Sequence, residues 1–306
     1  MVAGLAEAPP TSSARAPLLT LLAATVTVVV WASAFVAIRY AGREVSAGAL
    51  SLGRLVVGSV VLGAFLLFQR QRRWPSRRDW GGLLVVGVAW FGIYNVTLNE
   101  AERHLDAGIA AMLVNVGPIL IAVLAGLVLH EGFPRGLFAG SVVAFAGVIV
   151  IGISSSTGVR ADAVGVVLCI TAAVAYSCGV VAQKPLLGRL SALTVTWLGC
   201  TIGMIVCLPF APALVHDLGH AQGSTVALIV YLGAFPTALA FTTWAYALSR
   251  TTAGKMGATT YVVPPLAILM GWAMLGEQPA LLAVAGGVLC LTGVGLTRRL
   301  GRSTPG

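Results

Sequence analysis

The chain has 306 residues, of which 58% are hydrophobic and only 9% are charged. Because a soluble domain carries about 25% charged residues, this composition excludes a water-soluble fold, which would lack the polar side chains to cover its surface. The formal net charge is +9, and the distribution of Lys and Arg along the chain explains it below.

Apolar runs of about 20 residues, the length that crosses a bilayer core as a helix, recur along the chain between polar or charged clusters. They predict an all-α integral membrane protein with ten transmembrane helices. The runs lie near residues 17–38, 48–69, 82–99, 107–129, 136–153, 163–182, 193–210, 226–248, 256–275 and 280–297.

The two ends of the chain are predicted to be tails. Residues 1–16 are small, polar and Pro-containing, which predicts a disordered cytoplasmic tail, and residues 298–306 are expected to form a second one. The first apolar run is too long for the core of a signal peptide, so the first helix is expected to be retained.

The Lys and Arg residues predict the orientation. With the N-terminus inside, the cytoplasmic segments hold fourteen of them and the opposite side holds four, which satisfies the positive-inside rule in the cytoplasmic membrane, with both termini cytoplasmic. The Arg-rich segment 69–80 could bind nucleic acid, but a topology determinant at the anionic leaflet explains it better, and no nucleic-acid partner is expected. The fourteen are Arg15, Arg70, Arg72, Arg73, Arg77, Arg78, Arg135, Lys184, Arg189, Arg250, Lys255, Arg298, Arg299 and Arg302, and the four are Arg39, Arg43, Arg103 and Arg160.

One stretch of the chain occurs twice. AGIAAMLVNVGPILIAVLAGLVLHE (Ala107 to Glu131) and AGKMGATTYVVPPLAILMGWAMLGE (Ala253 to Glu277) align at a shift of 146 positions. The shift pairs Pro118 with Pro264 and the two terminal glutamates with each other. Proline and glutamate are scarce enough here to make accident an unsatisfactory explanation, so the stretch belongs to a duplicated unit.

The duplicated unit contains five helices, in residues 17–153 and again in residues 163–297. The first helices of the two halves align at a shift of 145, which pairs Trp31 with Tyr176. Because five is odd, the second half must enter the membrane from the opposite side, giving two inverted five-helix repeats. Transporters that work by alternating access use such repeats, so that their inward-open and outward-open states are near mirror images.

Each half carries A-G-x(9)-P-x(12)-E followed by a Gly-rich helix. Together with WASAF at Trp31 to Phe35 and AYALSRTTAG at Ala245 to Gly254, this pattern resembles the EamA branch of the drug/metabolite transporter superfamily over residues 17–297. The resemblance implies export or exchange of a small metabolite, often an amino acid or related compound, across the cytoplasmic membrane. It implies no single substrate.

Arg54 is the first candidate for the substrate site, because it is the only basic residue well inside an apolar run. An Arg at the bilayer centre costs about 2.5–3.5 kcal/mol on insertion scales. Since Arg54 lies only a turn or two from the start of its helix, its side chain can either face a cavity or extend to the outer interface. The resemblance favours the cavity.

Pro118 and Pro264 occupy equivalent positions in helices 4 and 9, where they are expected to be mid-helix kinks. The carbonyl that a kink frees needs a partner, so both helices should face the protein interior or a wet cavity. Asn115 and Tyr261, also paired by the repeat, lie one turn earlier and are expected to line the same cavity. A packing kink without substrate contact is the alternative.

Helices 3 and 8 add aromatic and amide side chains, namely Trp90, Tyr94, Asn95 and Trp244. An aromatic stripe in a soluble helix is usually core, but amides within a span seldom face lipid. We therefore expect these residues to line a substrate cavity between the halves, where inverted repeats place their sites. Trp31, Ser33 and Tyr176 are weaker candidates of the same kind.

Glycines recur in helices 5 and 10, where small residues allow helices to approach closely in a membrane. They predict that these two helices pack together, either as a supporting pair or as the face of a homodimer. The residues are Gly136, Gly140, Gly147, Gly286, Gly287 and Gly293.

Neither a metal nor another cofactor is expected, because the five cysteines and four histidines show no ligand spacing and no acidic residue falls near mid-span. Two other classes of function stay open. A membrane-embedded enzyme would need a nucleophile beside a base, which no run offers. A channel or scaffold would leave the paired prolines and aromatic residues without a role.

Overall fold

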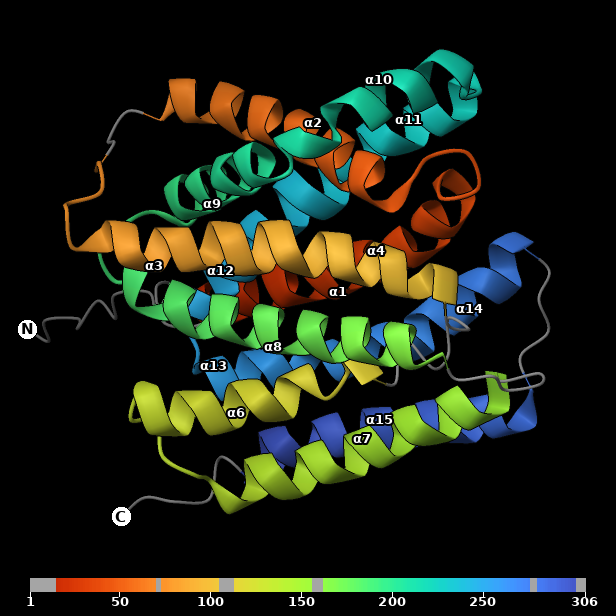
Figure 1. Cartoon of the computed structure of the whole chain (residues 1–306). Helices are drawn as coiled ribbons and strands as arrows, with labels where there is room; N and C mark the ends of the chain where they lie inside the picture. Colours follow the sequence, from red (N-terminus) through yellow and green to blue (C-terminus); the bar gives the residue numbers. More distant parts are fainter. Residues whose placement is uncertain (1–14, 70–72, 105–112, 156–161, 276–279, 301–306) are drawn as a thin grey trace, which may run out of the picture.

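The computed structural model describes residues 15–69, 73–104, 113–155, 162–275 and 280–300. Every regular element within these ranges is helical, which agrees with the all-α prediction (Figure 1). The tails at 1–14 and 301–306, the residues Arg70, Arg72 and Arg160, and Glu277 at the end of the second repeat stretch lie outside the described residues.

Within the described ranges, five helical segments are long and apolar enough to cross a membrane. Three are continuous α-helices, and the other two each contain a π-helical turn between α-helical parts. The continuous ones are α1 (Arg15–Ala41), α2 (Ala47–Phe68) and α8 (Ala163–Leu186). The composite ones are α3 (Asp79–Val85) with η1 (Val86–Tyr94) and α4 (Asn95–His104), and α11 (Gly223–Leu232) with η3 (Gly233–Leu239) and α12 (Ala240–Ser249).

A sixth span would consist of two helices that meet at a bend of 53°. It joins α9 (Ala192–Val206) to α10 (Ala211–His220) through the short η2 (Leu208–Phe210). Pro209 and Pro212 lie in the first turns of η2 and α10, where a missing N–H costs no helical hydrogen bond. The sequence predicted the end of this span at residue 210, and the structure continues it as α10.

The uninterrupted described stretches of the remaining apolar elements are 17 residues or shorter, as in Arg135–Ile151 and Leu281–Thr297, so length and composition of the described residues support five or six crossings rather than the ten expected. These elements are α6 (Gly117–Val128), α7 (Arg135–Ser155), α13 (Ala253–Thr259), η4 (Thr260–Val262), α14 (Val263–Leu275) and α15 (Leu281–Leu300). The first helix begins at Arg15 and the last ends at Leu300, so each extends slightly beyond its predicted limit.

The duplication in the sequence is visible in the elements. The starts of α6 and α14, at Gly117 and Val263, lie 146 positions apart, as do those of α7 and α15 at Arg135 and Leu281. The two π-helical turns, η1 and η3, also occupy equivalent places in their halves. The spacing of apolar residues did not predict these π-helical turns. A run that is apolar throughout has the same pattern whether or not one of its turns contains an extra residue.

The two halves interleave. The third segment of the first half packs against α8 and α9, whereas its counterpart in the second half packs against α1 and α2. Equivalent glycines make both contacts close, because a Cβ on Gly87 would overlap Ile202 and one on Gly233 would overlap Val57. The interface between the repeats is therefore built by the same contact used twice.

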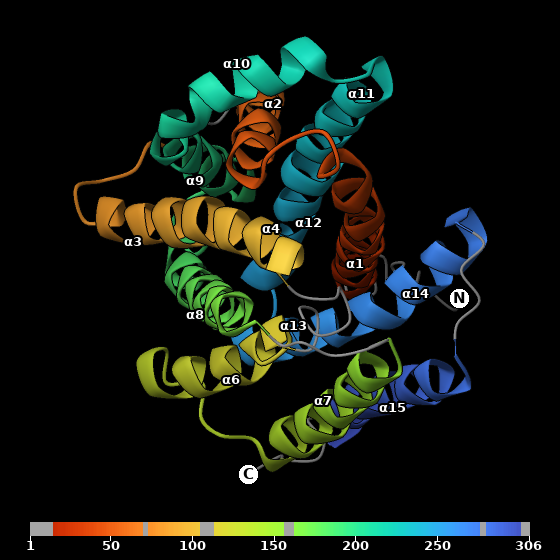
Figure 2. The same cartoon turned by 45° about the vertical axis from the view of Figure 1, so that its right-hand side comes forward.

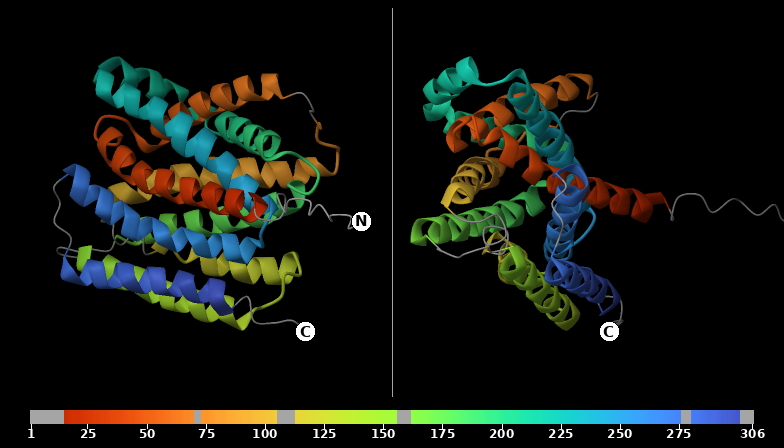
Figure 3. Two further views of the ribbon diagram at one scale, coloured as in Figure 1. Left: turned by 180° about the vertical axis from the view of Figure 1, so that it is seen from behind. Right: turned by 90° about the vertical axis from the view of Figure 1, so that its right-hand side faces the viewer.

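Helices α7 and α15 lie side by side at the edge of the bundle in every view (Figures 1, 2 and 3). A Cβ on Gly140 would lie 2.6 Å from the carbonyl oxygen of Gly293, and one on Gly147 would lie 2.5 Å from that of Gly286. As residue numbers rise in α7 they fall in α15, so the pair is antiparallel. The prediction that these glycine-rich helices pack together is confirmed.

Candidate substrate cavity

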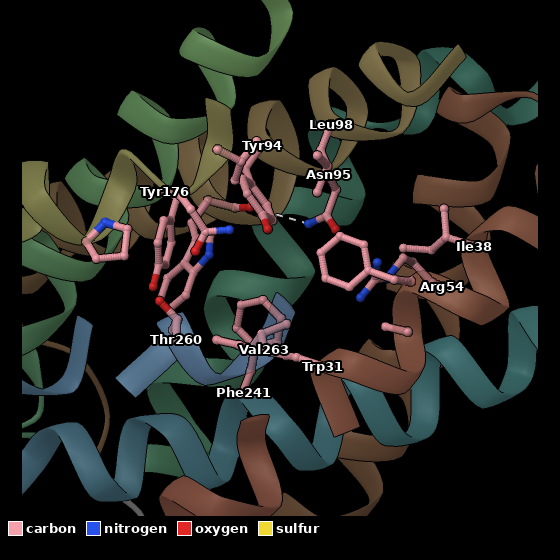
Figure 4. Close-up of a pocket in the computed structure, with 16 residues that line it drawn as sticks. Trp31, Ile38, Arg54, Tyr94, Asn95, Leu98, Tyr176, Phe241, Thr260 and Val263 are labelled. Carbon is pink, nitrogen blue, oxygen red and sulfur yellow. Dashed lines mark hydrogen bonds between the residues drawn. The ribbon is translucent and has the colours of Figure 1, made fainter. Parts of the chain in front are cut away.

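A cavity of about 90 Å³ lies between the halves, in the interior of the bundle (Figure 4). It extends from Trp31 toward the end of α1 at Ile38, about 10 Å further along the helix at 1.5 Å per residue. The lining comes from α1, α2, η1, α4, α6, α8, α12, η4 and α14, and from the segment before α6. Its residues are Trp31, Ala34, Phe35, Ile38, Arg54, Trp90, Tyr94, Asn95, Leu98, Val114, Asn115, Pro118, Tyr176, Phe241, Thr260 and Val263.

The π-helical turn η1 decides which side chains of the third segment reach the cavity. Trp90, Tyr94 and Asn95 all line it, whereas in an undisturbed α-helix residues 90 and 95 would lie on different faces. The Asn95 side-chain amide donates to the Phe91 carbonyl at 2.9 Å and to the Trp90 carbonyl at 3.3 Å, which holds it across the widened turn. π-Helical turns of this kind occur often at functional sites.

Arg54 is buried, with 5% of its surface exposed, and lies two turns into α2 at the cavity wall. Its Nε donates a hydrogen bond to the Thr237 hydroxyl at 3.0 Å. No ion pair joins Arg54 to an acidic side chain within the part of the chain that the structure describes. Tyr94, Asn95 and Arg54 point toward the same space (Figure 4). The structure therefore places a buried basic side chain at the cavity wall.

One end of the cavity is formed by a group of rings that we call the aromatic cluster: Trp31, Trp90, Phe91, Tyr176, Phe241 and Trp244. Trp31 lies 5.1 Å from Trp244 and 5.2 Å from Phe241, measured between ring centroids. Trp90 lies 4.9 Å from Phe241 and 5.4 Å from Tyr176. The rings come from both halves, so the cluster closes the cavity at the interface between them.

Polar contacts lie beyond the aromatic cluster, at the end of the bundle where α1 begins; those of Glu131 join the two halves, and those of Lys184 lie within the second half. The Glu131 carboxylate accepts hydrogen bonds from the backbone N–H groups of Ala253 at 2.8 Å and Gly254 at 3.3 Å, which cap the start of α13. The Lys184 ammonium donates to the carbonyls of Leu248 at 2.7 Å and Thr251 at 2.5 Å. The Glu131 carboxylate therefore links the two repeats.

Both prolines differ from the expected mid-helix kinks. Pro118 lies in the first turn of α6, after a turn at Asn115 and Val116. Pro264 lies in the first turn of α14, after the short η4. A proline there replaces an N–H that has no helical partner, so the chain is interrupted before the proline rather than bent at it.

Of the nine predicted site residues, six line the cavity: Arg54, Trp90, Tyr94, Asn95, Asn115 and Pro118. The other three, Trp244, Tyr261 and Pro264, are buried and do not line it. All three belong to the second repeat. The weaker candidates Trp31 and Tyr176 line the cavity, whereas the Ser33 hydroxyl bonds the Tyr231 hydroxyl at 2.6 Å.

Sequence analysis missed the apolar part of the lining, which includes Phe35, Ile38, Leu98, Val114 and Val263. These residue types are equally frequent on lipid-facing surfaces, so composition carried no signal for them. Within the described residues, no group of three or more His, Cys, Asp or Glu side chains could hold a metal ion.

Known proteins share the sequence pattern and the fold described above. The profile of the EamA-like transporter family matches the chain twice, over residues 18–153 and 163–299. The chain belongs to the EamA-like transporter family. It is therefore a multi-pass membrane protein and a transporter of small metabolites, and the duplicated unit seen in its sequence is the EamA-like unit.

Relatives of this EamA-like transporter have named functions of the same kind. A "probable terminal-alkyne amino-acid exporter" of Streptantibioticus cattleyicolor is 38% identical, over 93% of this chain and 97% of its own length. An uncharacterized transporter of Bacillus subtilis, YdfC, is 33% identical over 87% of each chain. A "probable amino-acid metabolite efflux pump" of Salmonella typhimurium is 24% identical over 67% of this chain and 71% of its own.

The fold also matches a crystal structure. The TM-score is 0.77 at 21% sequence identity, over 94% of this chain and 99% of the other. This likeness establishes the shared fold.

Proposed function

We propose that this EamA-like transporter exports an amino acid or a closely related compound across the cytoplasmic membrane by alternating access. One observation carries the proposal: a buried Arg54 without an acidic partner among the described residues lines a cavity between two repeats. A charge within a membrane-embedded protein is costly unless it is paired. The carboxylate of a substrate would provide the missing partner.

The proposed topology has ten spans, with residues 17–153 and 163–297 as inverted repeats and both termini in the cytoplasm. The antiparallel packing of the equivalent helices α7 and α15 supports inversion, because a repeat turned over in the membrane runs in the opposite direction. The beginning of α1 and the end of α15 lie at the same end of the bundle, in agreement with two cytoplasmic termini (Figures 1 and 3).

On this orientation the structure represents an outward-facing state. The cavity extends toward the ends of α1 and α4 through Ile38 and Leu98, which then face the outside. The aromatic cluster and the contacts of Glu131 with the start of α13 close the cytoplasmic side. Transport would require these contacts to separate while the outer ends of the helices come together.

The proposed substrate class follows from the lining. A volume of about 90 Å³ is small beside the roughly 300–1,000 Å³ of sites for drug-sized ligands. Arg54 offers hydrogen-bond donors to a carboxylate, and Trp31, Trp90 and Phe241 offer apolar walls. The names of the Streptantibioticus and Salmonella relatives, which refer to amino-acid export, support the same class.

Counterflow in proteoliposomes tests the proposal. Vesicles loaded with an unlabelled amino acid should accumulate trace radiolabelled amino acid transiently, and Arg54→Gln should reduce that accumulation. A channel would equilibrate the label without overshoot. Failure of every amino acid in a panel to produce an overshoot, with correctly inserted protein, would refute the proposed substrate class.

A further inference from the structure

The three predicted site residues that lie outside the cavity share one property. The repeat alignment pairs Trp244 with Leu98, Tyr261 with Asn115, and Pro264 with Pro118, at a shift of 146 positions. Each first-repeat partner lines the cavity, whereas each second-repeat residue is buried. The cavity wall toward the end of α1 therefore includes Leu98, Asn115 and Pro118, whose equivalents in the second repeat are buried away from the cavity.

Some of the buried equivalents of cavity-lining residues have polar side-chain atoms without a hydrogen bond to any described residue. The Trp244 Nε1, the Tyr261 hydroxyl and both polar atoms of the Gln183 side chain are buried without a hydrogen-bond partner among the residues that the structure describes. Gln183, in α8, is 0% exposed and pairs at a shift of 145 with Ile38, which also lines the cavity. Eight buried side-chain atoms of the described residues lack a hydrogen bond, and four of them belong to equivalents of the cavity wall.

Such atoms lose their water on burial and gain nothing in return, so proteins normally pair them. In a transporter that alternates between two states, groups that are unpaired in one state can be hydrated or bound by substrate in the other. Inverted repeats supply that second state, because each half can adopt the arrangement now held by the other.

We propose that Gln183, Trp244 and Tyr261 line an inner vestibule that opens toward the cytoplasm and binds the same solute when the outer cavity closes. This inference rests on the proposed alternating access and names the second half of its binding path. The residue equivalent to Arg54 is Gly199, because α2 and α9 begin 145 positions apart, after the N-cap residues Ser46 and Ser191. The vestibule therefore offers neutral amide, indole and phenol donors to a carboxylate, where the outer cavity offers a cation.

The contacts that must separate are the ones that close this side. A Cβ on Gly254, at the start of α13, would lie 3.7 Å from the Ala122 Cβ of α6. That separation suits a disulfide, for which the two Cβ atoms lie about 3.5–4.5 Å apart. Only the flexible end of Leu137, 2.6 Å from the same position, would need to shift. Cysteines at 122 and 254 can therefore lock α6 to α13.

The test measures labelling by a membrane-impermeant maleimide in right-side-out and inside-out vesicles. Single cysteines are placed at Gln183 and, as the matched outer position, at Ile38, in full-length protein whose five native cysteines are replaced. Ile38→Cys should be labelled from outside and Gln183→Cys from the cytoplasmic side. Val180→Cys, the equivalent of cavity-lining Phe35, is a second inner reporter with a smaller change of volume.

Val195→Cys is the matched negative control. It is 0% exposed and one turn into α9, and its equivalent, Leu50, does not line the cavity. It should remain unlabelled from both sides. Oxidising an added Ala122→Cys/Gly254→Cys pair should abolish inner labelling at 183 and 180 and leave outer labelling at 38 intact.

Two results would overturn the inference: no labelling at 183 and 180 from either side while 38 is labelled, or inner labelling that the 122–254 disulfide does not change. Neither measurement needs a substrate. Counterflow in the same preparations tests the proposed amino-acid substrate separately, so a wrong substrate and a missing vestibule give different results.

Discussion

The Nε of Arg54 lies 3.0 Å from the Thr237 hydroxyl, which in turn donates to the Leu232 carbonyl at 2.9 Å. Arg54 belongs to the first repeat and Thr237 to the π-helical turn η3 of the second. The contact holds the guanidinium by one nitrogen at the interface between the repeats. Its terminal nitrogens are the groups proposed to bind a carboxylate.

Replacing Arg54 by Gln should weaken substrate binding. A hydrogen bond to a charged group is worth about 1.5–3 kcal/mol, so the apparent affinity in counterflow should fall by about 10- to 100-fold. Arg54→Lys should recover only part of it, since an ammonium cannot both bond Thr237 and bind a carboxylate with two donors. Ser59→Ala is the control, because Ser59 lies on the same helix and bonds Thr201 outside the cavity lining. Equal affinity of the Gln variant and wild type would contradict the role of Arg54.

Glu131→Gln should favour opening toward the cytoplasm. A carboxylate can accept from both the Ala253 and Gly254 N–H groups, whereas a neutral amide presents only one acceptor oxygen. We expect maleimide labelling of Val180→Cys from the cytoplasmic side to become several-fold faster, and Glu131→Ala to have a larger effect. Glu100→Gln, which alters an exposed pair with Arg103 at 3.3 Å, should leave the labelling rate unchanged. Slower labelling in Glu131→Gln would be inconsistent with a closing contact.

Gly147→Ala should destabilise the protein. The new Cβ would lie 2.5 Å from the Gly286 carbonyl oxygen and 2.6 Å from the Cys290 backbone nitrogen. Backbone atoms cannot rotate away, so α7 and α15 must separate, at a cost of about 1–3 kcal/mol for an overpacked core. Thermal unfolding in detergent should show a lower Tm. Gly295→Ala in α15, with nothing within 4 Å of the new Cβ, is the control and should retain the wild-type Tm.

Glu44 should give an acid-dependent stability. Its carboxylate accepts from the Gln222 N–H at 2.9 Å and the Thr225 hydroxyl at 2.7 Å, and these bonds lower its pKa below the usual 4.5. A carboxyl with a lowered pKa stabilises the fold above its unfolded pKa and loses that effect as pH falls through the folded value. The Tm difference between wild type and Glu44→Gln should therefore be present at pH 7 and shrink below about pH 4.5.

Thr225→Val provides the comparison for Glu44, because it removes one donor and keeps the carboxylate. It should show a smaller Tm difference at pH 7 than Glu44→Gln and retain part of the pH dependence through Gln222. A Tm difference for Glu44→Gln that stays constant with pH would show that the carboxylate charge has no part in this contact.

The charge distribution predicts the orientation of the chain. Reporter fusions after Arg73 and Arg302 should report the cytoplasm, and a fusion at His216 should report the outside. A periplasmic signal from a fusion in the Arg70–Arg78 segment would reverse the orientation. The proposed outward-facing assignment of the cavity would then reverse with it.

The sequence by itself determined the membrane-embedded all-helical class, the duplication and its register, and most of the polar candidates for the site. These features depend on composition and on residues that are rare in an apolar chain. Pro118, Glu131 and Arg54 stand out because each is costly within a membrane and needs a structural or functional reason to be there. A shift between two copies requires no knowledge of the fold.

Only the tertiary structure decided which equivalents share a space. Asn115 and Tyr261 are related by the repeat, yet one lines the cavity and the other is fully buried. The repeat predicts that the two residues have matching surroundings in their own halves, but one conformation opens only one end of the interface. Two other features depend in the same way on packing between the halves. One is the widened turn at η1, which brings Trp90 and Asn95 to one wall, and the other is the interruption of the helix before Pro118 and before Pro264. The hydrophobicity of the sequence alone does not encode this packing.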